Sequence, residues 1–510
     1  MLRDAWTREA EQMEENLFSK FAMGAPPTEP ATKPAPRPDD DELLSSEQLR
    51  VVDLVLQGHN VFFTGEAGTG KSTVTRRIIA ELKKKYGEQF GQRVAVAAMT
   101  GIAATHIGGS TLNSALGLGV PTTARDFRTM FSSRKRLREY EVLILDESSM
   151  CSADMFDRIE EMLRSIRGGV RPAGGLQIVL TGDMFQLPPI ETAPSPDDPP
   201  DAFYNRGYIF ESAAWKACKF TVVLLTKVFR QSDAHFSGLL NAVRHGGPGA
   251  DAALAELFSS CSRELECTDG IAPTLIFPRN AEVDAINASE LAKLPGPRAT
   301  FVARDDVSVS SMVRNQGSAS ASASARSRLL QSNFFKSCQA PPRLELAVGA
   351  QVMLVKNLDT RAGLVNGSRG VVVGVSPPNG ATVQFRCGTR HFCGPVKFTS
   401  TMHGLGEANR TQVPLKLAWA LSAHKSQGCT LDYAKVDLRG TFAAGQAYVA
   451  LSRARTMDGL QIVGYDPGCA RTDPAVVAFH SALRGGSAAA SPRASAYAFV
   501  DEDDNDDHTL

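Results

Sequence analysis

A glycine-rich segment that ends in lysine and serine is the part of this chain best suited to chemistry: Gly65-Glu66-Ala67-Gly68-Thr69-Gly70-Lys71-Ser72. It follows the apolar residues 61–63 and precedes a helix-like stretch that begins at Thr73, the strand, loop and helix order of a phosphate-binding P-loop. The glycines allow backbone N–H groups to surround phosphates, and the following helix adds its positive end. Lys71 is expected to reach the β- and γ-phosphates, and the Ser72 hydroxyl to hold Mg²⁺. Residues 65–73 are therefore predicted to bind a nucleoside triphosphate.

Two carboxylates, Asp146 and Glu147, follow the apolar run 142–145. If that run is a strand of a parallel sheet, both side chains lie at its C-terminal edge and face the P-loop. Asp146 suits a Mg²⁺ ligand, and Glu147 suits the orientation or activation of the attacking water. A surface acidic pair is the alternative, but the upstream P-loop favours the hydrolytic interpretation.

Three further residues suit a hydrolytic site, although the sequence pattern leaves their roles open. Gln186 lies in the loop after the apolar run 177–181, where it either senses the γ-phosphate or is an ordinary polar loop residue. Arg230 and Arg453 are candidates for positive charge at the γ-phosphate, which stabilises the transition state of hydrolysis. A solvated surface arginine is the alternative for each.

The composition describes a globular protein of ordinary kind. The 510 residues are enough for two or more domains, and hydrophobic and charged residues make up 43% and 22%. No apolar run reaches the roughly 18 residues of a membrane span. The nine cysteines include no CxxC pair, so we expect reduced thiols in an intracellular protein rather than a zinc site.

Net charge is zero, but it is distributed unevenly along the chain. Residues 1–42 carry five basic and ten acidic residues, and residues 486–510 carry one and six. Removing both ends from the totals of 55 and 55 leaves 49 basic and 39 acidic residues in the middle. An excess of about ten positive charges is compatible with nucleic-acid contact but does not establish it.

The elements that must position these residues follow from the apolar pattern. Short apolar runs at 61–64, 94–98, 142–145, 177–181 and 221–225 alternate with helical stretches, which predicts a doubly wound parallel sheet. Residues 343–400 are β-rich and punctuated by glycines, which favours a small antiparallel barrel. Strand-like runs return at 413–421, 433–438 and 460–463.

Other segments are poor in such signals. Residues 1–24 form either an amphipathic helix that docks a protein partner or an unstructured terminus, and their acidic residues argue against a mitochondrial transit peptide. The proline-rich segment 26–41, the Ser-Ala repeat within 316–328 and the acidic tail after Gly485 are predicted to be disordered.

Further segments form an ordered series with the P-loop. They are Ser45-Ser46-Glu47-Gln48, Thr100-Gly101-Ile102-Ala103-Ala104, Met155 to Pro189, Leu415 to Thr430, and Tyr448 to Arg455. Together they resemble the motifs of superfamily-one DNA helicases, and within these the PIF (petite integration frequency) family. The resemblance runs from about Ser45 to Pro467.

The resemblance implies two RecA-like α/β domains with ATP between them and a small SH3-like β-barrel insertion in the second. Lys71, Ser72, Asp146, Glu147 and Gln186 would come from the first domain and Arg230 and Arg453 from the second, while Gln48 would bind adenine. The implied boundaries are 1–42 for an N-terminal helix and linker, 43–227 for domain 1, 228–300 with 408–485 for domain 2, 301–342 for a disordered insertion, 343–407 for the barrel, and 486–510 for a disordered tail.

The resemblance also implies a path for single-stranded DNA across both domains. The residues expected to contact it are Thr100, Gly101, Thr111, Asn113, Asn366, His424 and Lys425. Asn113 stands where the family usually has histidine, so it can form hydrogen bonds but cannot stack as an imidazole does. Two alternatives stay open: Thr111 as a helix N-cap and His424 as an interior histidine.

The expected function is that of an ATP-dependent 5′-to-3′ DNA helicase. It would translocate on single-stranded DNA and unwind duplexes at single-strand/duplex junctions, G-quadruplexes or RNA–DNA hybrids, in replication, repair, recombination or telomere maintenance. We expect a monomer with no membrane association, located in the nucleus, with the mitochondrion as the alternative. The competing interpretations are a RecD-like helicase subunit and an ATP-switched DNA-binding or remodelling protein that hydrolyses ATP without unwinding.

Overall fold

The computed structural model describes residues 44–484 apart from 120, 193, 195, 197, 230–232, 266–271, 311–318, 332–333, 357, 360–361, 363, 365–366, 403–405 and 429–430. The expected N-terminal helix, the linker 26–41, the acidic tail, Arg230 and Asn366 therefore lie outside the described residues. No described helix combines the length and apolar character needed to cross a membrane.

The first sheet contains six parallel strands in the order β3-β2-β4-β5-β1-β6. The strands are β1 (Val61–Gly65), β2 (Val94–Ala98), β3 (Ser110–Thr111), β4 (Val142–Asp146), β5 (Gln177–Thr181) and β6 (Thr221–Leu225). All five apolar runs predicted as strands in this part of the chain are confirmed. Only β3 was not anticipated, because a strand of two residues has no readable alternation.

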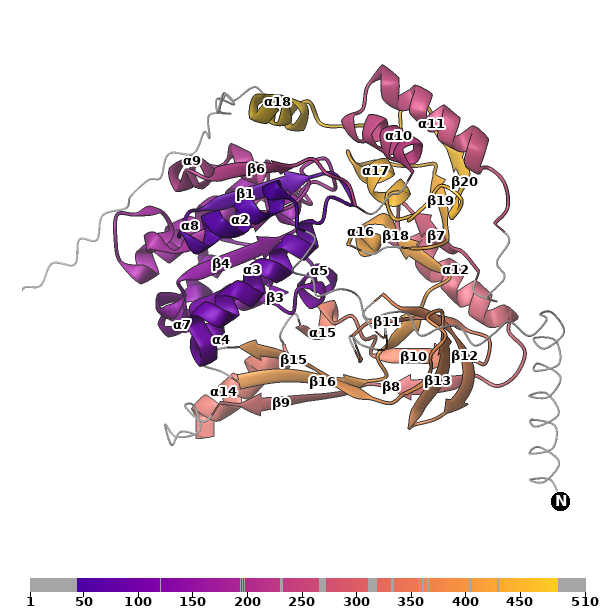
Figure 1. Ribbon diagram of the computed structural model, residues 1–510. Helices are drawn as coiled ribbons and strands as arrows, with labels where there is room; N and C mark the ends of the chain where they lie inside the picture. Colours follow the sequence, from indigo (N-terminus) through magenta and orange to yellow (C-terminus); the bar gives the residue numbers. More distant parts are fainter. Residues whose placement is uncertain are drawn as a thin grey trace, which may run out of the picture. The chain divides into compact units, whose positions relative to one another are not determined.

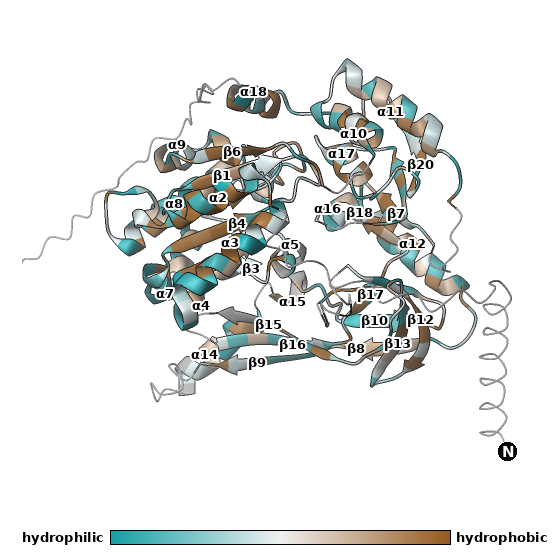
Figure 2. Ribbon diagram, in the orientation of Figure 1, coloured by the Kyte–Doolittle hydropathy of each residue, from teal (hydrophilic) through white to brown (hydrophobic). Residues whose placement is uncertain are grey.

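Helices cover both faces of this sheet, as the doubly wound prediction requires (Figure 1). Val61 and Phe63 pack with α2 (Ser46–Leu56) and α3 (Lys71–Tyr86). Phe62 points the other way, into a core shared with α8 (Ala153–Arg167) and α9 (Ala213–Cys218). Strands buried on both faces are mainly apolar, which explains the brown strand β4 in Figure 2. Shorter elements complete this part: η1 (Gly87–Gln89), α4 (Phe90–Arg93), α5 (Gly101–His106), α6 (Leu112–Leu116), η2 (Ala124–Ser133), α7 (Arg134–Glu139), η3 (Ser148–Met150), η4 (Pro172–Gly175) and η5 (Ile209–Glu211).

A second parallel sheet has the order β18-β7-β19-β20. Its strands are β7 (Thr274–Phe277), β18 (Ala420–Ser422), β19 (Ala434–Leu438) and β20 (Leu460–Tyr465). The helices of this part are α10 (Ala234–His245), α11 (Pro248–Cys261), α12 (Asn280–Lys293), α16 (Ala423–Ser426) and α17 (Gln446–Leu451). β7 and β18 are neighbours in the sheet but distant in sequence, so the residues between them form an insertion. Two α/β units, each with a parallel sheet, agree with the expected pair of RecA-like domains.

The insertion is mostly antiparallel. Its largest sheet has the order β14-β13-β12-β11-β17, and it contains β11 (Gln351–Leu354), β12 (Arg369–Ser376), β13 (Gly380–Phe385), β14 (Arg390–Cys393) and β17 (Leu415–Leu417). A second sheet joins β15 (Val396–Met402), β16 (Gly406–Gln412) and β9 (Arg304–Val309), and a third joins β8 (Ala299–Val302) and β10 (Arg343–Leu346). The β-rich character expected for 343–400 is confirmed, whereas the SH3-like barrel stays a prediction.

The segment 301–342 differs from the disorder expected of it. β9 pairs with β16 over residues 304–309, and Arg410 binds Asp305 through two hydrogen bonds of 2.7 Å. The Ser-Ala repeat lies largely within α14 (Ala319–Leu330), followed by α15 (Phe334–Ser337). Because alanine, arginine and leucine favour helix and Leu329 is buried against Val307, the described residues of this segment form helices and a strand despite their simple composition.

The C-terminal helix α18 (Pro474–Arg484) packs differently from its expected place in domain 2. Its Val476 and Phe479 join the core of the first sheet, and the Phe479 ring stacks on Phe210 with centroids 4.1 Å apart. The domain boundary near 408 differs too, because β16 and β17 continue the antiparallel sheets to Leu417. The rest of the domain division stays a prediction.

Candidate active site

The glycine-rich segment forms the loop between β1 and α3. Gly68 and Gly70 have φ angles of 92° and 82°, a backbone region that residues with a Cβ rarely adopt. The Lys71 ammonium lies over this loop and donates to the carbonyl oxygens of Gly65 and Glu66 at 2.7 and 2.9 Å. Ser72 is exposed at the first turn of α3, and the Thr73 N–H donates to the Gly70 carbonyl. The structure therefore gives these residues the P-loop arrangement that the pattern predicted.

Gln48 reaches this loop from α2. Its buried amide donates to the carbonyl oxygen of Thr69 at 3.0 Å. A Cβ added at Gly70 would lie 2.5 Å from the Gln48 Nε2, so the amide packs directly against the loop. The structure thus brings Gln48 to the P-loop, while its contact with adenine stays a prediction.

Asp146 ends β4, and Glu147 follows it at the C-terminal edge of the first sheet. Burial and the adjacent charge of Glu147 raise the pKa of Asp146 to about 7, while its hydrogen bond from the Glu147 N–H and the charge of Lys71 oppose that rise. Oxygen ligands from Asp146 and Ser72 fit the preference of Mg²⁺, which usually takes one or two protein oxygens and completes its shell with phosphates and water. The donor set is therefore chemically suitable for Mg²⁺.

Glu147 is positioned by a residue of the second α/β unit. Its backbone has φ 52°, in the left-handed region that costs free energy for a residue other than glycine. Its carboxylate accepts a hydrogen bond from the Gln427 amide at 3.0 Å. Gln427 lies in the segment after α16, so this contact joins the two α/β units beside the carboxylates.

Gln186 lies in the loop after β5 and is almost fully buried. Its N–H donates to the Asp183 carbonyl at 2.9 Å, and its side-chain Oε1 is buried without a hydrogen-bond partner among the described residues. Gly445, at the start of α17, packs so closely that a Cβ there would lie 2.6 Å from the Gln186 carbonyl oxygen. The loop is fixed by its surroundings, and the buried Oε1 leaves an acceptor for a donor that a ligand could bring.

A tyrosine, an arginine and an aspartate connect the second unit directly to the P-loop. The Tyr448 hydroxyl accepts from the Ala67 N–H at 2.9 Å and lies 3.3 Å from Asp183 Oδ2. Arg244 binds the same carboxylate at 2.8 and 3.1 Å. Sequence reasoning assigned no role to any of them. Asp183, Tyr448 and Gln427 lie within the recognised motif segments, whereas Arg244 lies in a helix with no motif to mark it.

Arg453 follows α17 and is 2% exposed. Its Nε donates to the Val449 carbonyl and its Nη2 to the Ser452 hydroxyl, both at 2.8 Å. These bonds orient the guanidinium on the same segment that contacts the P-loop through Tyr448. A direct role at the γ-phosphate stays a prediction.

The residues expected to contact DNA in the first unit lie at or near the starts of the short helices α5 and α6. The Thr100 hydroxyl accepts from the Ala103 N–H at 3.2 Å, and Gly101 begins α5. The Thr111 hydroxyl accepts from the Ser114 N–H, so the N-cap alternative for Thr111 is confirmed. The Asn113 amide donates to the Gly119 carbonyl at 2.9 Å. These bonds fix the side chains without testing a DNA contact.

In the second unit, His424 and Lys425 lie in α16. Lys425 is exposed, and His424 is half-buried, so it is not the fully interior histidine of the alternative. Burial lowers the pKa of His424, and its ring is nearly parallel to that of Phe442, with centroids 6.5 Å apart. Phe442 is 53% exposed. A neutral imidazole beside an exposed ring suits base stacking.

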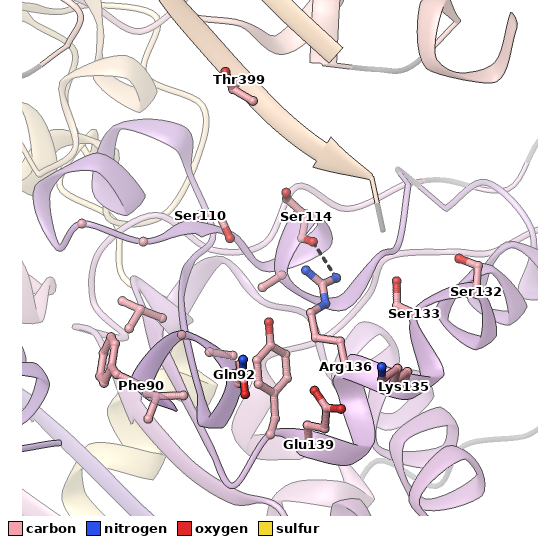
Figure 3. A pocket seen from close by; sticks show the side chains of 18 residues that line it. Phe90, Gln92, Ser110, Ser114, Ser132, Ser133, Lys135, Arg136, Glu139 and Thr399 are labelled. Atoms are coloured by element: carbon pink, nitrogen blue, oxygen red, sulfur yellow. Dashed lines mark hydrogen bonds between the residues drawn. The ribbon is translucent and has the colours of Figure 1, made fainter. Parts of the chain in front are cut away.

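A separate cavity of about 690 Å³ lies beside the β2–β3 edge of the first sheet (Figure 3). Its labelled lining includes Arg136, whose guanidinium points toward Ser114 and donates to the Ser114 carbonyl at 3.3 Å. Thr399 of β15 lines it from the insertion. None of the predicted nucleotide or DNA residues is among the residues that line this cavity.

A P-loop, an Asp-Glu pair on a neighbouring strand and contacts from a second parallel sheet define a nucleotide hydrolase of the two-RecA-domain class. Comparison with known proteins narrows this class. Residues 43–248 match the model of the PIF1-like helicase family, and residues 330–375 match that of the DNA helicase Pif1 2B domain. The chain belongs to the PIF1-like helicases, a family of ATP-dependent DNA helicases.

Individual relatives support this membership. The chain is 36% identical to ATP-dependent DNA helicase PIF1 of Xenopus laevis over 461 residues, which cover 89% of this chain and 67% of the relative. It resembles the crystal structure of Pif1 helicase from Candida albicans with a TM-score of 0.69 and 33% identity, covering 86% of this chain and 99% of that one. It also resembles Pif1 helicase from Bacteroides in complex with ADP-AlF3 and single-stranded DNA, with a TM-score of 0.61 and 29% identity. That match covers 87% of this chain and 98% of the Bacteroides chain. The chain thus spans about two thirds of the length of the Xenopus relative.

Proposed function

We propose that this chain is an ATP-dependent DNA helicase that translocates 5′ to 3′ on single-stranded DNA and unwinds duplexes. The observation that carries the proposal is that residues of the second α/β unit reach the P-loop and the Asp146-Glu147 pair of the first, through Tyr448 and Gln427. A ligand bound there would contact both units. The ADP-AlF3 and single-stranded DNA complex of the Bacteroides relative supports the same ligands for this chain.

In the proposed mechanism, Ser72 and Asp146 would hold Mg²⁺, and the ion would supply positive charge to the phosphates. Lys71 exchanges its carbonyl partners for the β- and γ-phosphates, and P-loop N–H groups bind the same oxygens. Glu147, held by Gln427, orients the attacking water. Gln186, Arg230 and Arg453 act at the γ-phosphate, and Gln48 selects adenine.

The two α/β units would move relative to each other because both bind the same ATP. Binding of the negatively charged triphosphate by both units favours a closed arrangement, and loss of the γ-phosphate removes part of that attraction. If Thr100, Gly101, Thr111 and Asn113 grip DNA on one unit while His424 and Lys425 grip it on the other, alternating affinity converts each cycle into a step. Grip through phosphates is independent of sequence, so binding should weaken strongly with salt.

The test is unwinding of a duplex with a single tail. The wild-type chain should separate strands only with a 5′ tail and ATP, while Lys71→Ala should lose ATP hydrolysis and unwinding by at least about a hundredfold and keep DNA binding. Full DNA-stimulated hydrolysis by Lys71→Ala would exclude the P-loop assignment. Hydrolysis without strand separation by the wild type would favour the remodelling alternative.

We further propose action on single-strand/duplex junctions as a monomer located in the nucleus, with the mitochondrion as the alternative. Localisation of a tagged chain decides between these compartments. Competition among a forked duplex, a G-quadruplex and an RNA–DNA hybrid in the same unwinding assay identifies the preferred substrate. An SH3-like insertion and a partner-binding N-terminal segment belong to the same proposal.

A further inference from the structure

A buried network joins the P-loop to the second α/β unit. It consists of Asp183 in the loop after β5, Arg244 in the last turn of α10 and Tyr448 in α17, and we refer to it as the Asp183 network. These side chains are 0%, 1% and 2% exposed. Polar groups buried this deeply need partners, and here the partners come from different units of the protein.

Hydrogen-bond directions within the network are fixed by chemistry. The Ala67 N–H can only donate, so the Tyr448 hydroxyl accepts from it at 2.9 Å. The same hydroxyl then donates its proton to Asp183 Oδ2 at 3.3 Å. Burial and the negative charge of Asp183 raise the pKa of Tyr448, so the phenol keeps the proton that this bond requires. One hydroxyl therefore links a P-loop amide to a buried carboxylate.

The carboxylate of Asp183 also holds the loop that carries Gln186. Asp183 Oδ1 accepts from the Phe185 N–H at 3.2 Å, and the Asp183 carbonyl accepts from the Gln186 N–H at 2.9 Å. Arg244 neutralises this carboxylate and lies 4.1 Å from the centroid of the Phe185 ring. The P-loop and the Gln186 loop thus depend on one anion whose counter-charge comes from the second unit.

A role in stability alone does not account well for this arrangement. Desolvation offsets much of the attraction in a buried ion pair, so such pairs contribute little stability compared with apolar packing. Their best-supported use is to favour one arrangement of the chain over others. The arrangement favoured here fixes the positions of the P-loop, the Gln186 loop and the α17 segment relative to one another.

We propose that Tyr448 is a positioning residue for ATP hydrolysis. Its hydroxyl fixes the Ala67 amide and, through Asp183, the Gln186 loop, in register with the segment that carries Arg453. Tyr448 acts through the P-loop and not by touching the reacting atoms. This inference rests on the proposed function and adds the route by which the position of the second unit reaches the phosphate-binding loop.

Tyr448→Phe tests the proposal because it keeps the ring and removes only the hydroxyl. We expect kcat for DNA-stimulated ATP hydrolysis to fall at least about tenfold, with KM for ATP and Kd for single-stranded DNA within about twofold of the wild type. The matched control is Tyr465→Phe, whose ring packs on Phe258 at the end of β20. Its kcat should equal that of the wild type, and both variants should have similar melting temperatures.

A double-mutant cycle separates positioning from general damage. Tyr448→Phe removes the hydrogen bond to Asp183, and Asp183→Asn removes the charge that strengthens it. Both changes act on the same link, so the kcat of the double variant should be close to that of the less active single variant. Losses that multiply, or a Tyr448→Phe kcat equal to the Tyr465→Phe control, overturn the inference. If Asp183→Asn does not fold, the Tyr448→Phe comparison decides alone. A wild-type chain without DNA-stimulated hydrolysis would instead reject the proposed function.

Discussion

Glu147 combines backbone strain with a contact from the other α/β unit. A non-glycine residue in the left-handed region costs about 1–3 kcal/mol, and such strain gathers at functional sites where the surroundings enforce it. Here the neighbouring constraint is the hydrogen bond from Gln427, which is itself 2% exposed. The carboxylate that we propose as the water-orienting group is therefore constrained by its own backbone and by the hydrogen bond from Gln427.

Gln427→Met should slow ATP hydrolysis by about tenfold, because it removes the amide that orients Glu147 while nearly conserving volume. Steady-state hydrolysis at saturating DNA measures this. Kd for single-stranded DNA, measured by fluorescence anisotropy, should stay within about twofold. A variant that binds DNA weakly but hydrolyses ATP normally when saturated would contradict the assignment and make Gln427 a DNA-contact residue instead.

Site residues were predictable from the sequence where neighbouring residues mark their position. Lys71 follows a glycine-rich loop, and Asp146 and Glu147 lie at the end of an apolar run. Arg244 could not be found this way, because its partner Asp183 lies 61 residues away and nothing in α10 distinguishes a buried arginine from a solvated one. Thr111 shows the opposite case, since its N-cap bond is local and was anticipated.

Helices and strands were predictable where their buried side chains form an apolar pattern in the sequence. The strands of the first sheet are apolar on both faces, so their runs were visible. β9 was not, because most of its side chains are exposed and its extended form depends on pairing with β16, about a hundred residues later. The simple composition of α14 gave no helix signal, and among its described side chains Leu329 joins an apolar cluster while Ala325 is also buried. The rule that low complexity means disorder was wrong for these described residues.

Helix α18 brings a histidine into the interior beside the Asp183 network. His480 is 6% exposed, with its ring 5.0 Å from Phe185 and 5.8 Å from His245. Burial, with the charges of Arg244, Arg484 and His245, lowers the pKa of His480 to about 4, while Asp183 acts in the opposite direction. Since an unfolded histidine has a pKa near 6.5, the unfolded chain takes up this proton first as pH falls.

His480→Phe should therefore reduce the acid sensitivity of the fold. The stability associated with neutral His480 is fully present above about pH 6.5 and is lost as pH falls toward 4. At pH 5 the loss in unfolding free energy amounts to about 2 kcal/mol. Denaturation at pH 7.5 and pH 5.0 should show a smaller loss in His480→Phe than in the wild type. The exposed His59, as His59→Gln, is the control and should follow the wild type. Equal losses in all three would contradict the role of His480.

At the scale of the molecule, buried polar contacts connect the two α/β units beside the nucleotide site. Among the described residues they include the Gln427–Glu147 bond, the bonds from Tyr448 to Ala67 and Asp183, and the Arg244–Asp183 pair. α18 adds apolar contact by returning from the second sheet to the core of the first. The family and its fold were predictable from ordered motifs. These contacts join residues that are far apart in the sequence, so no local sequence pattern indicates them.

Arg244→Met should be among the most destabilising single changes in the chain. It leaves the Asp183 carboxylate buried without its counter-charge, which typically lowers the unfolding free energy by about 3–5 kcal/mol. Asp183→Asn in the same chain removes that charge, so the double variant should be more stable than Arg244→Met alone. Arg343→Met provides the control: Arg343 contacts Glu345 at the same 2.8 Å but is largely exposed, so the expected loss is below about 1 kcal/mol. Urea denaturation of the four chains measures all three effects. If Arg244→Met and Arg343→Met are equally stable, Asp183 is not held by its partner across the units. The connection between the second α/β unit and the nucleotide site would then rest on the contacts of Tyr448 and Gln427.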